Sequence, residues 1–212
     1  MSEETEEKKS NKMETWCGLL LGVFAAILAI ANVGGGKYGG DEIKAVIAKG
    51  EAYAWYQSKS IKENMYEGQM DLMKSFVSAG IIPSDKTAGI DSLLKKLSKK
   101  IATKEKEKNE IMKGSDNIPK EEWVQEVMNE ETGKNEMGKV VGVKDWDSAI
   151  AKLGDACDLF DKANLFLPIC LVMGGICLIS PSDQGRKTFF GAMILLGLIG
   201  SVYTAYGFIV AP

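Results

Sequence analysis

The sequence of 212 residues contains no histidine and a single arginine, Arg186. Without histidine, the chain has neither imidazole acid–base chemistry nor histidine metal ligands. With one arginine, it lacks the guanidinium clusters that bind phosphate groups bidentately. Three of the four cysteines, Cys17, Cys170 and Cys177, lie in apolar stretches, so Cys157 is the one cysteine of the polar part and has no partner there for a disulfide. We therefore expect no enzyme, and no catalytic residue, metal or cofactor.

Charged side chains are also missing from three long stretches of the chain. Residues 15–36, 163–182 and 188–212 contain no Asp, Glu, Lys or Arg over 22, 20 and 25 residues. Crossing the apolar core of a bilayer, roughly 30 Å thick, takes about 20 helical residues. We predict membrane helices at residues 15–36, 163–182 and 188–210, with the lipid bilayer as a partner, and this pattern excludes a soluble globular enzyme.

The charged tail at residues 1–14 distinguishes a membrane anchor from a signal peptide. Ala-Ile-Ala at residues 29–31 would fit cleavage by signal peptidase, but signal peptides begin with a basic segment and this tail is rich in glutamate. An uncleaved anchor is therefore favoured. The polar turn at residues 181–187 is short, so the second and third membrane helices are expected to form an antiparallel hairpin.

Small residues recur at helical spacing in the first and third membrane stretches. Such residues let helix backbones approach closely in lipid. They fit either ordinary packing within one bundle or a seam between copies, and the candidates for helix packing are Gly18, Gly22, Ala26, Gly197, Gly200 and Thr204.

Basic residues near the membrane stretches predict the orientation. Lys8, Lys9 and Lys12 lie in the tail, and Arg186 and Lys187 lie in the turn. Short segments rich in Lys and Arg stay on the cytoplasmic side. We expect the N-terminal tail in the cytoplasm and the charged middle of the chain outside, in the cytoplasmic (inner) membrane of a bacterium.

Glycines are concentrated at residues 34–40, directly after the first apolar stretch. We expect them to break the helix and to form a flexible hinge at the membrane surface. A phosphate-binding loop would need Ser or Thr after its lysine, and here Tyr38 follows Lys37.

The charged middle, residues 41–162, reads as helical. Asp41 is a good N-cap residue, and a long helix should run from it to about Ser78, ended by Gly80 and Pro83. A second helix fits residues 86–113, which gives an elongated helical hairpin or coiled coil. Its seam on the first helix is predicted at Ile43, Ile47, Gly50, Ala54, Gln57, Ile61, Met65, Gly68, Leu72 and Phe76.

Two further helices are predicted before the second membrane stretch. Residues 118–128 fit a short helix with Pro119 in its first turn. Asp145 begins another helix, which should continue into residues 163–182. The fold class is therefore all-α, with three membrane helices and the helical domain inserted between the first and the second.

A cluster of aromatic and basic residues marks the first long helix of the middle part. Amphipathic aromatic side chains beside lysine suit cation–π contacts and protein interfaces. Packing within the hairpin competes with this interpretation. The candidate interaction surface consists of Tyr53, Trp55, Tyr56, Lys59, Lys62 and Tyr66.

The basic run at residues 95–100 does not predict a nucleic-acid partner. No aromatic residue interrupts it and an acidic segment follows it, so a solvated helix face is the better interpretation. Asp155, Asp158 and Asp161 recur on one helix face, which supplies too few oxygen ligands for a hard cation.

Residues 55–62, Trp-Tyr-Gln-Ser-Lys-Ser-Ile-Lys, with Tyr66 and Glu67, follow the first membrane stretch at a short distance. Near the other end, an apolar stretch ending at Ser180 precedes Arg186 and a glycine-punctuated stretch. In these features the chain resembles a bacterial membrane-protein family known as a domain of unknown function (four-three-three-seven). The resemblance implies a protein with three membrane spans and brings no assigned activity.

Two functions remain open. The first is a non-catalytic scaffolding or assembly protein of the membrane, whose helical domain self-associates or docks to another membrane protein. The alternative is an accessory or pore-forming subunit of a transport system, although ionisable residues within the spans, the usual mark of such a role, are missing.

Overall fold

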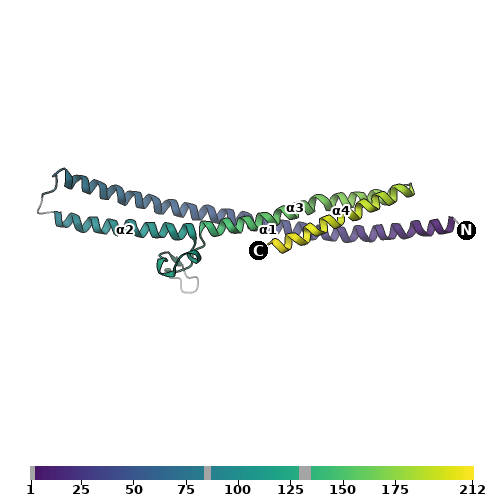
Figure 1. The fold of residues 1–212 in the computed structure, drawn as a ribbon, viewed down its shortest axis with the longest axis horizontal. Helices are drawn as coiled ribbons and strands as arrows, with labels where there is room; N and C mark the ends of the chain where they lie inside the picture. Colours follow the sequence, from purple (N-terminus) through teal and green to yellow (C-terminus); the bar gives the residue numbers. More distant parts are fainter. Residues whose placement is uncertain (1–2, 84–86, 129–134) are drawn as a thin grey trace. The chain divides into compact units, whose positions relative to one another are not determined.

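The computed structural model describes residues 3–83, 87–128 and 135–212, and these are predominantly helical (Figure 1). The long helices are α1 (Glu3–Ser78), α2 (Thr87–Lys113), α3 (Val143–Ile179) and α4 (Asp183–Val210). The all-α prediction is confirmed for these four elements. Between α2 and α3 lie two single-turn 3₁₀ helices and a two-stranded ribbon: η2 (Ser115–Asn117), η3 (Lys120–Glu122), β1 (Glu126–Met128) and β2 (Asn135–Met137).

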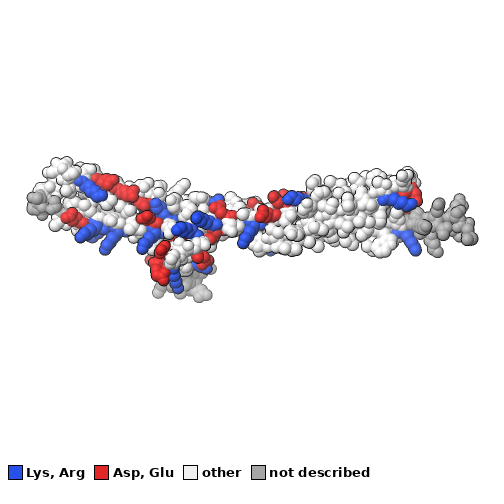
Figure 2. All heavy atoms as spheres, viewed as in Figure 1, with Lys and Arg blue, Asp and Glu red and all other residues white. Residues whose placement is uncertain are grey.

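The chain divides into two compact units. One, here the apolar unit, comprises Met1–Ile43 and Ala149–Pro212, and the other, the polar unit, comprises Lys44–Ser148. α1 and α3 contribute residues to both units, α4 belongs to the apolar unit, and α2 with the ribbon belongs to the polar unit. Charged side chains gather over the polar unit, whereas the apolar unit presents mostly uncharged atoms (Figure 2).

Three helices are long and apolar enough to cross a membrane, as predicted. They are α1, α3 and α4, and each contains an 18-residue window of high mean hydropathy with at most two charged residues. A helix of this kind satisfies its backbone hydrogen bonds internally, which is the condition for residing in hydrocarbon.

α3 and α4 form an antiparallel pair within the apolar unit. Ser182 caps α4, because its hydroxyl accepts a hydrogen bond of 3.1 Å from the backbone N–H of Gly185. The guanidinium of Arg186 donates through Nε to the carbonyl of Ser180 at 2.9 Å and so satisfies the end of α3. Further along, the Cys170 thiol donates to the Met193 carbonyl at 3.2 Å. The short polar turn therefore joins the two helices as the sequence predicted.

An aromatic trio brings α1, α3 and α4 together in the apolar unit. Tyr38 stacks on the fully buried Phe160 with 5.8 Å between ring centroids, and Phe208 meets Phe160 edge-on at 5.0 Å. A Cβ added at Gly34 would lie 2.6 Å from the Phe160 ring, and one at Gly207 would lie 2.9 Å from it. Glycine is therefore required at both positions for the helices to approach Phe160.

The expected helix break at residues 34–40 is wrong, because these residues belong to α1 without interruption. An isolated Gly costs a helix about 1 kcal/mol relative to Ala, which does not suffice to end it when packing compensates. Gly34 gains such packing from the rings of Phe160 and Phe208. The sequence pattern suggested a hinge here. At Gly34, the absence of a side chain instead allows close packing against the two rings.

The predicted helix-packing residues fall into two groups. Gly197, Gly200 and Thr204 are buried, and the first two lie against Phe24 and Leu167 respectively. The Thr204 hydroxyl donates to the Gly200 carbonyl of its own helix at 2.9 Å. The remaining candidates are exposed: Gly18, Gly22 and Ala26. No atom would lie within 4 Å of a Cβ added at either of the two glycines.

In the polar unit, the helix ends agree with the sequence and one short helix does not. α1 ends at Ser78 before Gly80, which has a φ of 67°, and α2 ends at Lys113 before Gly114, which has a φ of 85°. Lys86, the predicted first residue of the second helix, lies outside the described residues. The α-helix predicted for residues 118–128 is wrong: η3 and β1 occupy this stretch.

We expect Gly34→Ala to destabilise the protein and Gly36→Ala to be tolerated. The added methyl at residue 34 would overpack the Phe160 ring, which costs about 1–3 kcal/mol in tight cores. A Cβ at residue 36 has no atom within 4 Å, so that variant should match the parent or gain from the higher helix propensity of Ala. Thermal unfolding in detergent, followed by circular dichroism, measures both variants, and equal effects would contradict the packing role of Gly34.

Candidate interaction surface of the polar unit

Charged side chains join α1 to α2. Lys59 Nζ lies 2.7 Å from Glu107 Oε2, and Lys104 Nζ lies 2.7 Å from Glu107 Oε1. One helical turn further along α1, Glu63 pairs with Lys108. Ala52 clusters with Ile111, and the rings of Tyr56 and Tyr66 lie near Lys108 and Lys100. Over these contacts residue numbers rise along α1 as they fall along α2, so the two helices run antiparallel. Both carboxylates are largely buried, at 7% exposure for Glu107 and 8% for Glu63, which makes this a charged interface inside the unit.

The pairing shifts the pKa values of these groups. Burial alone would raise the pKa of Glu107, but hydrogen bonds from Lys104 and Lys59 outweigh it and hold the pKa below its usual range. The hydrogen bond to Glu63 raises the pKa of Lys108 against the opposing effect of burial. Each member is therefore stabilised in its charged form.

Near the C-terminal end of α2, the α1–α2 interface is apolar. Ala52, Ile111 and Val143 form a buried cluster, with Tyr56 and Trp146 packed against it. Val143 is the first residue of α3, so three helices meet at this small core. The polar unit is thus held by a small apolar core at one end and by ion pairs beyond it.

The predicted aromatic and basic cluster is divided by the structure. Tyr56 and Tyr66 lie beneath lysines of α2, with Lys108 Nζ 5.8 Å from the first ring centroid and Lys100 Nζ 5.0 Å from the second. Lys59 also faces α2 through Glu107. These three cluster members therefore contribute to packing within the unit.

The other three members of the cluster lie at the surface. Tyr53 and Trp55 retain 41% and 36% exposure, and Lys62 is exposed. Lys49 approaches the Tyr53 ring at 5.8 Å, and Lys59 approaches the Trp55 ring at 5.6 Å. The surface part of the cluster remains a candidate for contact with another molecule.

The predicted coiled-coil seam of α1 does not face α2. Ile47, Ile61, Met65 and Leu72 are 57%, 61%, 57% and 50% exposed. The prediction is wrong because Lys59 and Glu63 of α1 face α2, where they pair with Glu107 and Lys108. The apolar side of α1 therefore turns outward. We call this outward face within the polar unit the outer stripe: Ile47, Gly50, Ala54, Gln57, Ile61, Met65, Gly68, Leu72 and Phe76.

The buried carboxylate of Glu110, which the sequence pattern did not predict, holds the segment after α2 through hydrogen bonds. Glu110 is fully buried. Its Oε1 accepts a hydrogen bond from the Ser115 hydroxyl at 2.8 Å, and its Oε2 accepts from the backbone N–H groups of Val124 and Gln125 at 2.8 and 3.0 Å. These contacts hold residues 124 and 125 in place and explain why the predicted helix at 118–128 does not form.

Ser115 extends this network toward α3. Its hydroxyl accepts from the backbone N–H of Val140 at 2.8 Å, its own N–H donates to the Val140 carbonyl at 2.9 Å, and its carbonyl accepts from the Trp123 indole at 2.9 Å. No motif in the sequence distinguishes Glu110 from the neighbouring acidic residues of α2, since its role depends on chain segments 5 to 15 residues away.

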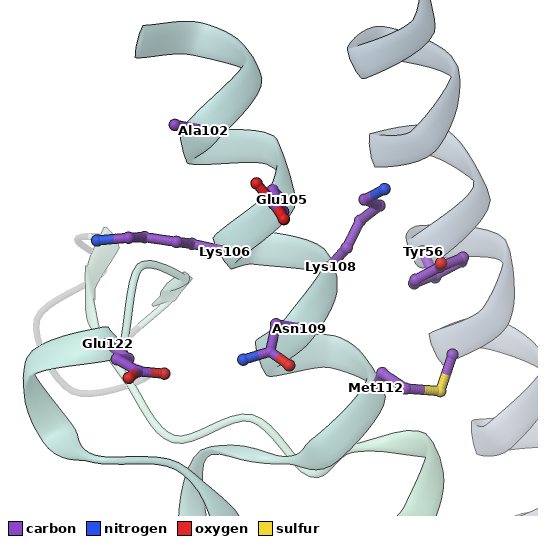
Figure 3. Close-up of a pocket in the computed structure, with 8 residues that line it drawn as sticks. All are labelled: Tyr56, Ala102, Glu105, Lys106, Lys108, Asn109, Met112 and Glu122. Atoms are coloured by element: carbon purple, nitrogen blue, oxygen red, sulfur yellow. The ribbon is translucent and has the colours of Figure 1, made fainter. Parts of the chain in front are cut away.

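A shallow groove of about 550 Å³ lies beside α2 (Figure 3). Its charged side chains point in different directions: Lys108 toward α1, Lys106 away from it, and Glu122 toward Asn109. They converge on no common point, which argues against a site for a small charged ligand. Within the described ranges, no three acidic or cysteine side chains lie close enough to hold one metal ion.

Comparison with protein families gives one match, which covers most of the chain. The family described as "Domain of unknown function (DUF4337)" matches residues 13–210. The chain belongs to the DUF4337 family. The match includes residues 80–142, so the polar unit is part of the DUF4337 domain as well. Searches of curated proteins and of solved structures give no match.

We expect Glu110→Gln to destabilise the polar unit by about 1–3 kcal/mol, the usual cost of leaving buried hydrogen-bonding groups unmatched. The new amide keeps one acceptor oxygen but turns an NH₂ group toward donors. Denaturant unfolding and amide hydrogen exchange at Val124 and Gln125 measure the loss. Glu105→Gln, at an exposed position of the same helix, is the control. Unchanged protection of those two amides in Glu110→Gln would refute the assignment.

Acid should weaken the contact between α1 and α2. Because the pKa of Glu107 is lowered on folding, its stabilising contribution is complete above the unfolded-state pKa of about 4.3 and disappears as the pH falls through the lower folded-state pKa. We expect Glu107→Gln to unfold at a lower temperature than the parent at neutral pH, and the two midpoints to converge below about pH 4. A constant difference from pH 7 to pH 3 would contradict this.

Proposed function

We propose that this DUF4337-family chain is a non-catalytic assembly protein of a membrane, which presents its polar unit, an inserted helical hairpin, for association with other protein. The observation that carries the proposal is the outer stripe, an apolar helix face left exposed on a unit that is otherwise charged. Three helices able to span a bilayer accompany it. An exposed apolar face of this length marks an interaction surface in soluble domains.

The surface of the apolar unit supports residence in a bilayer. Large apolar side chains stand outward on its helices, including Trp16, Val33, Ile179 and Leu195, with exposed fractions of 60%, 72%, 84% and 62%. In water this surface would be costly, whereas lipid accommodates it at no cost.

One ion pair supports the proposed orientation. Glu14, the last residue of the N-terminal tail, pairs at 2.9 Å with Arg186 in the first turn of α4. This end of the tail and the start of α4 are therefore neighbours in the apolar unit, which suits the basic residues that both segments carry. We propose that this end faces the cytoplasm and that the polar unit lies on the outer side of a bacterial inner membrane.

The proposal predicts that the protein leaves native membranes in a complex. Purified in mild detergent and measured by native mass spectrometry, the tagged chain should carry either further copies of itself or a co-purifying membrane protein. Only monomer, across several detergents and after cross-linking in intact membranes, would contradict an assembly role. Ion flux through reconstituted liposomes would instead support the alternative of a transport subunit.

A further inference from the structure

The outer stripe is regular along its whole length. Its positions follow one another by three or four residues, and from Ala54 onward they keep an eleven-residue repeat, which gives paired helices a right-handed supercoil. Between Ile47 and Phe76 the stripe is about 45 Å long at 1.5 Å per residue. Such spacing is typical of a helix that packs lengthwise against another helix.

Among the described residues of the polar unit, no element covers this stripe. α2 occupies the opposite side of α1, where Lys59 pairs with Glu107 and Glu63 pairs with Lys108. Turning α1 to bring the stripe against α2 would separate both pairs and leave buried charges without partners, which is strongly unfavourable. The stripe is therefore available to another molecule.

We propose that a second copy of this chain covers the outer stripe, so that the α1 helices of two protomers pair in parallel and in register. In such a pair each residue of the stripe faces its own equivalent, and like charges would repel. The stripe itself carries no charge, and uncharged residues border it closely: Ser58, Asn64, Gln69 and Ser75. Glu51, at the edge, would face Val46 of the other copy, because e positions oppose g positions in a parallel pair.

The side chains of the stripe suit a self-complementary seam. Gly50 and Gly68 have no atom within 4 Å of an added Cβ, so a second helix can approach them closely. Ile61, Met65 and Leu72 supply the apolar area. Gln57, midway along, is the stripe's polar member, and a pair of such residues can hydrogen-bond across a seam and fix its register.

The stripe offers apolar area along 30 residues of α1. Its five large apolar side chains each keep at least 37% exposure in the protomer, so a second helix would bury them. The parallel orientation rests on the proposed function, because anchoring in one bilayer makes both copies leave it in the same direction and raises their effective concentration.

Disulfide cross-linking in native membranes tests the seam directly. In full-length protein with Cys17, Cys157, Cys170 and Cys177 replaced by alanine, we expect Gln57→Cys and Met65→Cys each to give a dimer band on a non-reducing gel. Glu67→Cys, exposed on α1 but away from the stripe, is the matched control and should stay monomeric. Equal cross-linking at residue 67, or none at residues 57 and 65, overturns the proposal.

A charge exchange tests both partner and register. Ile61→Glu and Ile61→Lys each place like charges opposite one another in a self-pair, so each variant alone should lose the cross-linked dimer. Two differently tagged chains, one carrying Glu and the other Lys, should regain it when co-expressed. Because residue 61 is exposed in the protomer, circular dichroism should show unchanged helix content. Failure of the mixed pair to recover, with helicity intact, overturns the in-register dimer.

The two proposals fail in different ways. If the seam cross-links do not form but native mass spectrometry still shows a different membrane protein bound, the second copy is the wrong occupant and the assembly role stands. If the stripe cysteines are protected from a water-soluble maleimide in vesicles although the chains give no cross-link, the stripe lies on lipid, and the dimer is overturned. If the chain is monomeric and alone throughout, both proposals fail.

Discussion

The ion pairs of Glu107 with Lys59 and Lys104 determine which side of α1 faces inward in the polar unit. A hairpin of two helices ordinarily hides its apolar sides and exposes its charges. Here charged side chains meet at residues 104–108 of α2, although Leu97 and Ile111 of the same helix are buried. The apolar side of α1 is exposed as a consequence, and the arrangement of the whole unit follows from this pairing.

In the apolar unit, the helices are held together by close packing, whereas ion pairs join α1 and α2 in the polar unit. Phe160 is enclosed by Tyr38 and Phe208, and Gly34 and Gly207 provide the room for its ring. Since lipid gives no hydrophobic drive for helix association, close backbone approach and dispersion contacts must hold such helices together. Gly200 against Leu167 repeats the arrangement between α4 and α3, and Gly197 against Phe24 gives it between α4 and α1.

The sequence predicts the elements well where the signal is local. Uncharged stretches identify the helices able to span a membrane, and Gly80 and Gly114 mark helix ends through their left-handed backbone. The α1 seam was predicted with the right spacing but was wrongly expected to face α2. Periodicity identifies the apolar face of a helix but not the element that packs against it. Glu110 could not be found either, since its partners depend on how the chain returns after α2. Gly34 was expected to form a hinge because the ring of Phe160, which requires glycine there, is more than a hundred residues away in the sequence.

Arg186 closes the end of α3 through Ser180 and also reaches Glu14 at the start of the chain. During synthesis, Glu14 leaves the ribosome long before Arg186 does. This contact can therefore form only once the last hydrophobic segment is being made, so the first segment spends most of translation without its final neighbours. The order of assembly is thereby built into the chain: α1 is made early, and the start of α4, which it contacts through Glu14, follows much later.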